Sequence, residues 1–482
     1  MPEKSLKEKT VNGVLWNALN RFSAQGIQFV FNILIARILL PEDYGVVAML
    51  SIFLAVSQTF IDSGFANALI QKKNRTEADY NTVFYFNIAI SLLFCFLLWI
   101  SAPAIAAFYK TPILTKITRI VCFNLIINAF GAIQHVKLTI DINFKTQAVI
   151  SIISITAIGA VGLWMARKGY GVWALVVQSL VGSSVNTLLA WIFVRWRPKA
   201  VFSWKSLKEM FAFGSKLLAS GLIDTVWGNM YSITIGKVLN PTALGVYNRA
   251  ESFATFPSSN VYGLVQGVSY PVLCSIQDDR ERLREAFRRF IKLFAYVTFP
   301  MMIGLAAVAD PFIRLLLTDK WAESIPYLQI LCFSLMWYPI NGMNMTFPNV
   351  TGRSDLYLKM VVITKVLDVA VLFITIPLGL AAMCIGRICT AVIGFAICTQ
   401  NIRILLDYGT LKQVKDFSTS LLHSLIMGLL VILVMRLSDS HLVKLLLGAG
   451  TGVAYYLLTS VIFKKEEFYY LKDIVKQKIG KR

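Results

Sequence analysis

LLPEDYGV at residues 39–46 is repeated in altered form two hundred positions later, as VLNPTALGV at residues 238–246. The two segments share a Leu, a Pro, a Gly and a Val at the same spacing, at Leu39, Pro41, Gly45 and Val46 and again at Leu239, Pro241, Gly245 and Val246. Proline and glycine both interrupt helices. Each segment therefore predicts a tight turn between two helices, and the pair suggests that one structural unit occurs twice.

The composition is that of a membrane protein. Apolar residues make up 56% of the 482 residues, charged residues only 15%, and the mean hydropathy is +0.64. A soluble domain has about 25% charged residues. Apolar runs such as AISLLFCFLLWISAPAIAAF (89–108) are long enough to cross a hydrocarbon core of about 30 Å. We expect an all-α polytopic membrane protein, because continuous apolar runs rather than alternating strands carry the signal.

Polar breaks divide the apolar sequence into about fourteen transmembrane helices. Their expected limits are 13–38, 45–69, 81–108, 113–135, 147–166, 171–194, 211–237, 245–271, 290–317, 324–348, 357–378, 381–405, 417–436 and 442–463.

The positive charge predicts the orientation. The net charge is +21, and most Lys and Arg residues fall in the tail 1–12, in the even-numbered loops and in the basic tail 464–482. Basic residues concentrate in cytoplasmic segments. Both termini are therefore expected in the cytoplasm, and we expect no nucleic-acid binding.

The repeat extends beyond the two turns. IVCFNL (120–125) aligns with ILCFSL (330–335), so the first six spans look like a duplicate of the next six. Six is an even number, so both copies enter the membrane in the same direction and form a parallel repeat with a pseudo-two-fold axis along the membrane normal. The expected domains are two six-helix bundles at 13–194 and 211–405, a cytoplasmic amphipathic linker at 195–210 that we interpret as an interfacial helix, and two additional helices within 417–463.

Polar side chains inside spans are costly and mark functional candidates. The first span carries six of them on one helical face: Asn17, Asn20, Arg21, Gln25, Gln28 and Asn32. The alternative is that this face packs against polar groups of neighbouring helices. We prefer a water-filled cavity, because six such groups exceed what interhelical hydrogen bonding normally needs.

The equivalent seventh span has polar and aromatic residues on one side. Lys216, Asp224, Trp227 and Tyr231 recur at helical spacing. A flat aromatic ring beside hydrogen-bonding groups suits a sugar. Each aromatic residue alone could equally pack between helices.

Other ionisable residues lie inside the predicted spans, and all are candidates for the cavity or for structural or coupling ion pairs: Asp62, Arg249, Glu251, Lys365, Asp368 and Arg387. Lys365 and Asp368 are three residues apart on one helix and could neutralise each other. Arg249 and Glu251, two residues apart, point in different directions. We expect no metal and no cofactor, and leave open whether Na⁺ or H⁺ is coupled to the cycle.

Enzyme motifs are not found in the sequence. It contains no Walker A, Ser-x-x-Lys or HExxH pattern on an extramembrane segment. The short outer loops also disfavour a membrane polymerase of glycans. We therefore expect a transporter rather than an enzyme.

Three longer stretches resemble a known family. IARILLPEDYGVVAML (35–50), followed by FIDSGFANALIQKKNRTEADYNTVFYFN (60–87), and LGVYNRAESFATFPSSNVYGLVQGVSYPVL (244–273) resemble the polysaccharide-exporter branch of the MOP flippase superfamily, the Wzx and teichuronic acid exporter type. The resemblance implies a lipid-linked oligosaccharide flippase of the bacterial inner membrane that works by alternating access. Its cargo would be an undecaprenyl-pyrophosphate-linked glycan for surface polysaccharide or lipopolysaccharide synthesis.

The resemblance also assigns roles to residues. In lipid-II-flipping members, basic residues of the first and eighth spans engage the pyrophosphate, and Arg21 and Arg249 occupy comparable places here. The last two spans would guide the lipid tail. We expect a monomer that works beside the glycan polymerase and glycosyltransferases of its pathway. The alternative is a MATE-like cation-coupled multidrug exporter, which usually carries a carboxylate in the first span, where this chain has none.

Overall fold

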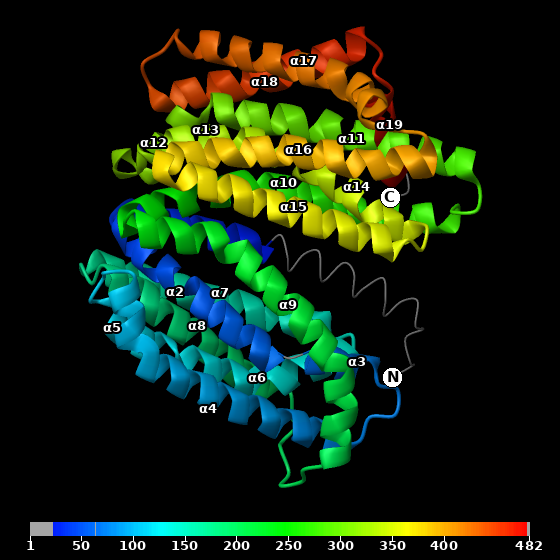
Figure 1. The fold of residues 1–482 in the computed structure, drawn as a ribbon. Coiled ribbons are helices and arrows are strands. Elements are labelled where there is room, and N and C mark those ends of the chain that lie inside the picture. Colours follow the sequence, from blue (N-terminus) through cyan, green and yellow to red (C-terminus); the bar gives the residue numbers. More distant parts are fainter. Residues whose placement is uncertain (1–22, 63, 480–482) are drawn as a thin grey trace. The chain divides into compact units, whose positions relative to one another are not determined.

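The structure, a computed structural model, describes residues 23–62 and 64–479. These residues form α-helices and short 3-10 turns, and no β-strand occurs among them. The prediction of an all-α chain is confirmed for this part of the sequence. The helices group into two compact units, one ending at Gly245 and one beginning at Val246, and each is described by itself (Figure 1).

The first unit is built from helices that pack against both neighbouring and more distant helices of the sequence. α4 packs on α6, α6 on α8, α7 on α8, and α2 on α9. A cluster of buried aromatic residues around Phe65, Phe84 and Trp196 fills one end. After the helical residues 23–38, the helices are α2 (Pro41–Asp62), α3 (Phe65–Gln71), α4 (Glu77–Phe108), α5 (Leu114–Val121), α6 (Phe123–Ile140), α7 (Phe144–Arg167), α8 (Val172–Phe193) and α9 (Trp204–Val238).

The second unit contains most of α10, whose first turn lies in the first unit. Within it α11 packs against α13 and α17, α16 packs against α13 and α15, and α17 packs against α18 (Figure 1). The helices are α10 (Pro241–Ser275), α11 (Arg280–Ala307), α12 (Ala309–Leu317), α13 (Ser324–Leu335), α14 (Tyr338–Val350), α15 (Ser354–Thr375), α16 (Leu380–Leu406), α17 (Thr410–Met435), α18 (His441–Ile462) and α19 (Glu466–Ile479), with 3-10 turns at Asp319–Trp321 and Ile376–Leu378.

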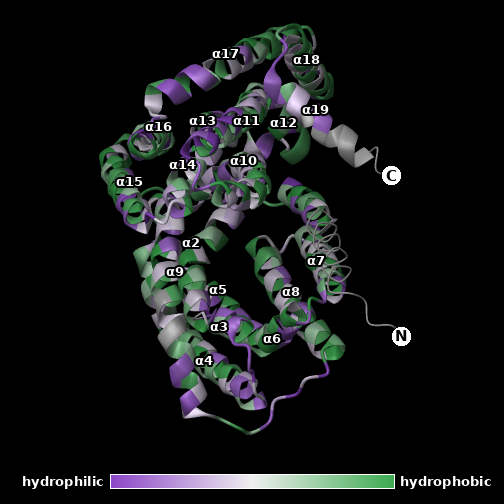
Figure 2. Ribbon diagram, turned by 90° about the vertical axis from the view of Figure 1, so that its right-hand side faces the viewer, coloured by the Kyte–Doolittle hydropathy of each residue, from purple (hydrophilic) through white to green (hydrophobic). Residues whose placement is uncertain are grey.

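Ten helical stretches among the described residues are long and apolar enough to cross a membrane. Figure 2 shows hydrophobic residues along much of α4, α7 and α18, and hydrophilic residues at helix ends such as the start of α17. The ten stretches are 41–71, 77–108, 114–140, 144–167, 172–193, 280–307, 354–378, 380–406, 410–435 and 441–462. A multi-span membrane protein is therefore confirmed, while the total of fourteen stays a prediction.

The four other predicted spans also lie on helices. They correspond to the helical residues 23–38, to α9, to α10 and to α13 with α14. α9 and α10 each have 35 residues, or about 52 Å at 1.5 Å per residue, which exceeds the thickness of a hydrocarbon core. α9 and α10 are not among the ten apolar stretches because polar residues are spread along both helices.

The repeated turns have the same local structure. Residues 39–40 and 239–240 are not helical and separate two helices in each case. The following helix begins at the shared proline, Pro41 or Pro241. The amide of Leu39 donates to the carbonyl of Ile35 at 3.0 Å, and the amide of Leu239 donates to that of Ile235 at 2.9 Å. Proline is favoured at the first helical position because its missing N–H would have no intrahelical partner there. The two predicted turns are confirmed.

These two turns also touch each other, backbone against backbone. An ideal Cβ on Gly45 would lie 1.7 Å from the carbonyl oxygen of Pro241, and one on Gly245 would lie 1.9 Å from the carbonyl oxygen of Pro41. The contact is reciprocal, since each glycine lies against the carbonyl group of the other segment's proline. Only glycine permits so close an approach at either position. We call this contact between residues 41–45 and 241–245 the Pro–Gly contact.

The linker differs from the expected interfacial helix. Residues 194–203 are not helical, and α9 begins only at Trp204. Pro198 lies within this segment and lacks an amide hydrogen. Side chains at the start of α4 bind the extended backbone instead: the Lys199 amide donates to Asn81 Oδ1 at 2.7 Å, and the Ser203 amide donates to Thr82 Oγ1 at 3.0 Å.

Replacing Asn81 with alanine should destabilise this attachment. Asn81 is fully buried and also donates from its Nδ2 to the carbonyl of Glu77 at 2.7 Å. Its loss removes the side-chain acceptor of the Lys199 amide, and such a hydrogen bond contributes about 0.5–1.5 kcal/mol to stability. Thermal unfolding of purified Asn81→Ala should therefore begin at a lower temperature than that of the wild type. Asn74→Ala, at an exposed position, is the control, and equal melting of both variants would contradict the attachment.

Candidate substrate pathway

A charged cluster joins α10 and α16 in the second unit. Arg387 donates through Nη1 to the Tyr247 hydroxyl at 2.5 Å and to the Glu251 carboxylate. The Tyr247 hydroxyl in turn donates to Glu251 at 3.2 Å. Tyr247 is fully buried, and the Glu251 and Arg387 side chains are 30% and 20% exposed. Each charge thus has a hydrogen-bonded partner, the condition under which a buried ion pair is tolerated.

Arg249 points in a different direction from Glu251, as predicted from their spacing. Its guanidinium lies 5.0 Å from the ring centroid of Trp321 and 6.0 Å from that of Phe253. Trp321 is fully buried. Stacking on an aromatic face attracts the cation and engages the flat side of the guanidinium, whereas its N–H donors lie in the plane of the group.

The helical residues 23–38 have two amide side chains exposed one turn apart. Gln28 and Asn32 are exposed and Gln25 is half-buried. Phe31 packs on α7, where a Cβ on Gly159 would lie 2.0 Å from the ring. The predicted polar residues Asn17, Asn20 and Arg21 lie outside the described residues.

α9 has two polar faces with different surroundings. Towards α2, the hydroxyls of Thr59 and Thr225 lie 3.0 Å apart, and the Ser51 hydroxyl donates to Asn229 Oδ1 at 3.1 Å. At about 100° per residue, the four positions predicted on this span (216, 224, 227 and 231) occupy an arc of about 80° turned away from this contact. Asp224 is exposed, Trp227 and Tyr231 are half-buried, and the side chain of Lys216 lies outside the described residues.

The remaining ionisable candidates lie on α2 and α15. Asp62 accepts a hydrogen bond from Gln58 at 3.0 Å on the same helix. Lys365 and Asp368 are both half-buried on α15, and their mutual neutralisation stays a prediction.

Sequence reasoning missed the partner of Arg387. Its counter-charge, Glu251, lies 136 residues away, so no local pattern connects them. Two signals were present. A lone cation inside an apolar run needs a carboxylate, and Tyr247 and Glu251 are four residues apart on one helix face.

Comparison with known proteins agrees with these observations. A family model described as "Polysaccharide biosynthesis protein" matches residues 34–326, more than half of the chain. The chain is 28% identical to the teichuronic acid biosynthesis protein TuaB of Bacillus subtilis (strain 168) over 357 residues, 73% of each protein. It is 26% identical to the lipopolysaccharide biosynthesis protein WzxC of Escherichia coli (strain K12) over 334 residues, 68% of this chain and 67% of WzxC.

Solved structures share the fold. The lipid II flippase MurJ, in an inward closed conformation, superposes with a TM-score of 0.76 at 19% identity, covering 94% of this chain and 99% of MurJ. An inward-facing MATE multidrug resistance transporter of the MOP superfamily superposes with a TM-score of 0.59 at 15% identity, covering 80% of this chain and 96% of the transporter. The chain belongs to the polysaccharide biosynthesis protein family, and its multi-span helical fold is the one seen in MurJ and in the MATE transporter.

Proposed function

We propose that this protein is a flippase for a lipid-linked oligosaccharide, and that it moves an undecaprenyl-pyrophosphate-linked glycan from the cytoplasmic to the outer leaflet of the bacterial inner membrane. The glycan is a precursor of surface polysaccharide or lipopolysaccharide. The names of the relatives TuaB and WzxC, and the fold shared with the lipid II flippase MurJ, support this cargo class.

The observation that carries the proposal is the uneven distribution of polar residues among long helices. Ten helical stretches among the described residues each contain an apolar segment long enough to cross a membrane. α9 and α10, each of 35 residues, are not among them and bear amides, carboxylates, a guanidinium group and aromatic rings, and the helical residues 23–38 bear the exposed amides Gln28 and Asn32. Polar groups facing lipid would be costly. Helices of this kind suit a water-filled path for a glycan head group, while the lipid tail stays in the membrane.

Arg249 is the described residue best placed to hold the pyrophosphate. Glu251, two residues from Arg249 in sequence, is paired with Arg387. Arg21 is the second proposed ligand, from the first span. Charge-assisted hydrogen bonds from arginine to phosphate are among the stronger polar contacts in proteins.

The sugars face the amides and the aromatic rings. Gln28 and Asn32 offer hydrogen bonds, and Trp227 and Tyr231 offer flat surfaces. Their neighbours on the same two helices complete the proposed set: Asn17, Asn20, Gln25, Lys216 and Asp224.

The proposed cycle is alternating access by two parallel six-helix bundles, with both termini in the cytoplasm. An anion leaving an inside-negative cell moves downhill by about 2.3 kcal/mol per charge per 100 mV. The potential therefore favours export of a pyrophosphate-linked cargo. The protein acts as a monomer in a membrane that also contains the glycosyltransferases and polymerase of its pathway.

Removing the proposed pyrophosphate ligands tests this function. In cells that lack the native gene, Arg21→Ala and Arg249→Ala should each lower surface glycan at least tenfold. The loss of a charged hydrogen bond, about 1.5–3 kcal/mol, corresponds to about 10- to 100-fold. The lipid-linked precursor should accumulate in the same cells, as measured by extraction and mass spectrometry.

Arg436→Ala is the matched control, because Arg436 is exposed at the end of α17. Membrane levels of each variant, measured by immunoblot, separate a transport defect from loss of the protein. Wild-type amounts of surface glycan from both Arg21→Ala and Arg249→Ala cells would refute the proposed pyrophosphate site.

A further inference from the structure

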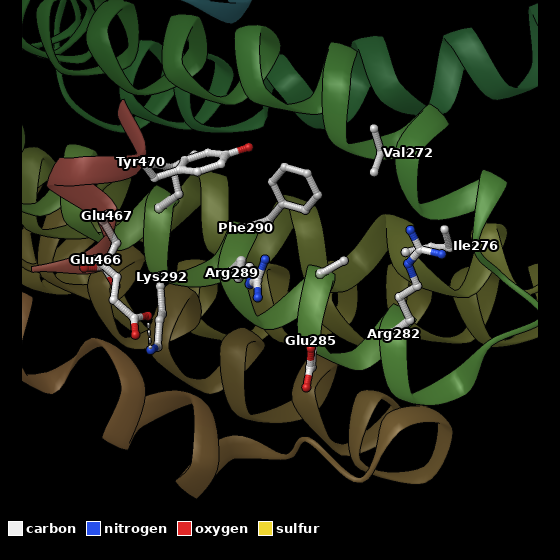
Figure 3. A pocket seen from close by; sticks show the side chains of 12 residues that line it. Val272, Ile276, Arg282, Glu285, Arg289, Phe290, Lys292, Glu466, Glu467 and Tyr470 are labelled. Atoms are coloured by element: carbon white, nitrogen blue, oxygen red, sulfur yellow. Dashed lines mark ion pairs between the residues drawn. The ribbon is translucent and has the colours of Figure 1, made fainter. Parts of the chain in front are cut away.

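The second unit has a cavity of about 670 Å³ where the end of α10, the start of α11 and the start of α19 meet. This volume is within the usual range of about 300–1,000 Å³ for small-molecule sites. Figure 3 shows Arg282 beside Ile276, Arg289 beside Phe290, and Tyr470 across from Phe290. The wall therefore combines guanidinium groups with apolar and aromatic side chains.

Most cations at the start of α11 already have partners. Arg288 binds Asp416 through two hydrogen bonds of 2.6 and 2.5 Å, and Lys292 lies 3.8 Å from Glu466. Arg280 donates to the carbonyl of Leu405 at 3.0 Å. Arg284 lies 3.5 Å from Glu281.

The two arginines that line the cavity are the exceptions. Neither the Arg282 nor the Arg289 guanidinium has a hydrogen-bond or ion-pair partner among residues 23–62 and 64–479. They are seven residues apart and so share one helix face. Glu285 lies between them in sequence, but Figure 3 shows its carboxylate directed away from Phe290 and Tyr470. The part of the cavity wall formed by α11 thus carries two guanidinium groups that have no partner among the described residues, together with the carboxylate of Glu285.

The position of the cavity along α11 indicates a membrane lipid. α11 begins with a charged segment and continues as one of the ten apolar stretches, so its first turns lie where head groups meet water. Val272, Ile276 and Leu293 form the apolar part of the wall. Aromatic rings such as that of Tyr470 are typical of this interface, and basic pockets between transmembrane helices bind anionic head groups.

We propose that this cavity binds the head group of an acidic phospholipid of the phosphatidylglycerol type. Arg282 and Arg289 hold the phosphate diester, and the apolar wall receives the first part of an acyl chain. Glu466 and Glu467 on α19 accept hydrogen bonds from the glycerol hydroxyls. The bound lipid ties α19 to α10 and α11. This site is separate from the proposed glycan path and does not depend on the identity of the glycan.

The test uses purified full-length protein in a mild detergent, titrated with dioleoyl-phosphatidylglycerol, dioleoyl-phosphatidylcholine or inorganic phosphate. Native mass spectrometry measures the retained lipid. Wild-type protein should bind phosphatidylglycerol at least tenfold more tightly than phosphatidylcholine. Arg282→Gln/Arg289→Gln should reduce phosphatidylglycerol affinity at least tenfold, and single Arg289→Gln at least threefold if the double variant does not fold.

Arg284→Gln removes the same charge from the opposite face of α11 and should bind phosphatidylglycerol within twofold of the wild type. Equal affinity for the two lipids would overturn the proposal, as would wild-type affinity in the Arg289→Gln variant. Displacement of phosphatidylglycerol by an equal concentration of inorganic phosphate would show an anion site without lipid recognition, and would overturn it as well.

Discussion

Replacement of Gly45 by alanine is expected to reduce glycan export at least tenfold. The new Cβ would lie 1.7 Å from the carbonyl oxygen of Pro241, far inside any van der Waals contact. The obstacle is backbone, so no side chain can rotate away, and the first turns of α2 and α10 must separate. Overpacking of a close contact typically costs about 1–3 kcal/mol. The amount of surface glycan measures the loss of export, and the melting temperature of the purified variant measures the loss of stability.

Gly245→Ala should have a similar effect, because its Cβ would lie 1.9 Å from the carbonyl oxygen of Pro41. The double variant should be less impaired than the sum of the two, since separation of the turns relieves both clashes at once. Gly267→Ala, on the same helix as Gly245 but with no neighbouring atom within 4 Å, is the control. Normal export and normal melting of Gly45→Ala would show that the Pro–Gly contact is unimportant.

The second large effect is expected at the ion pair of α10 and α16. Arg387→Gln removes the positive partner of Glu251 and also the hydrogen bond to Tyr247. Breaking a partly buried pair on one side costs on the order of 2 kcal/mol, less than for a fully buried pair, because water partly screens the remaining charge. The variant should unfold at a clearly lower temperature than the wild type in the same detergent.

Exchanging the charges of Glu251 and Arg387 distinguishes the loss of their ion pair from the effect of replacing each residue alone. Glu251→Arg/Arg387→Glu should recover part of the stability that each single reversal loses, because the two charges can meet again. Glu281→Gln, which removes a carboxylate from an exposed pair at 3.5 Å, should change the melting temperature little. Strictly additive losses in the double reversal would contradict the assigned pair.

The repeated turns could be predicted because their chemistry is local. A proline at the first helical position and a shared pattern of neighbours are sufficient to place each turn, and both helices begin at Pro41 and Pro241 as expected. The membrane class followed from composition, since so few charges cannot cover a soluble surface. Both features depend on local sequence and on composition, and neither requires knowledge of contacts between distant segments.

Other features depend on contacts between distant segments. The extended linker is held by Asn81 and Thr82, more than a hundred residues upstream, so the amphipathic pattern of the linker alone suggested a helix. The ion pair of Arg387 with Glu251 and the approach of Gly45 to Pro241 likewise join segments far apart in sequence. For the same reason, polar residues inside the predicted spans could be recognised as candidates for the glycan path, but the sequence did not show which of them form ion pairs with distant residues.

The most direct test of the central claim is a flipping assay in proteoliposomes with a fluorescent lipid-linked oligosaccharide. Purified protein should expose the inner-leaflet lipid to a membrane-impermeant reductant at least tenfold faster than in protein-free vesicles, and Arg249→Ala should lose this activity. The contradicting result is wild-type protein that does not speed up exposure of the lipid-linked oligosaccharide. If the same vesicles exchange a lipophilic cation for Na⁺ or H⁺, the protein is a multidrug exporter instead.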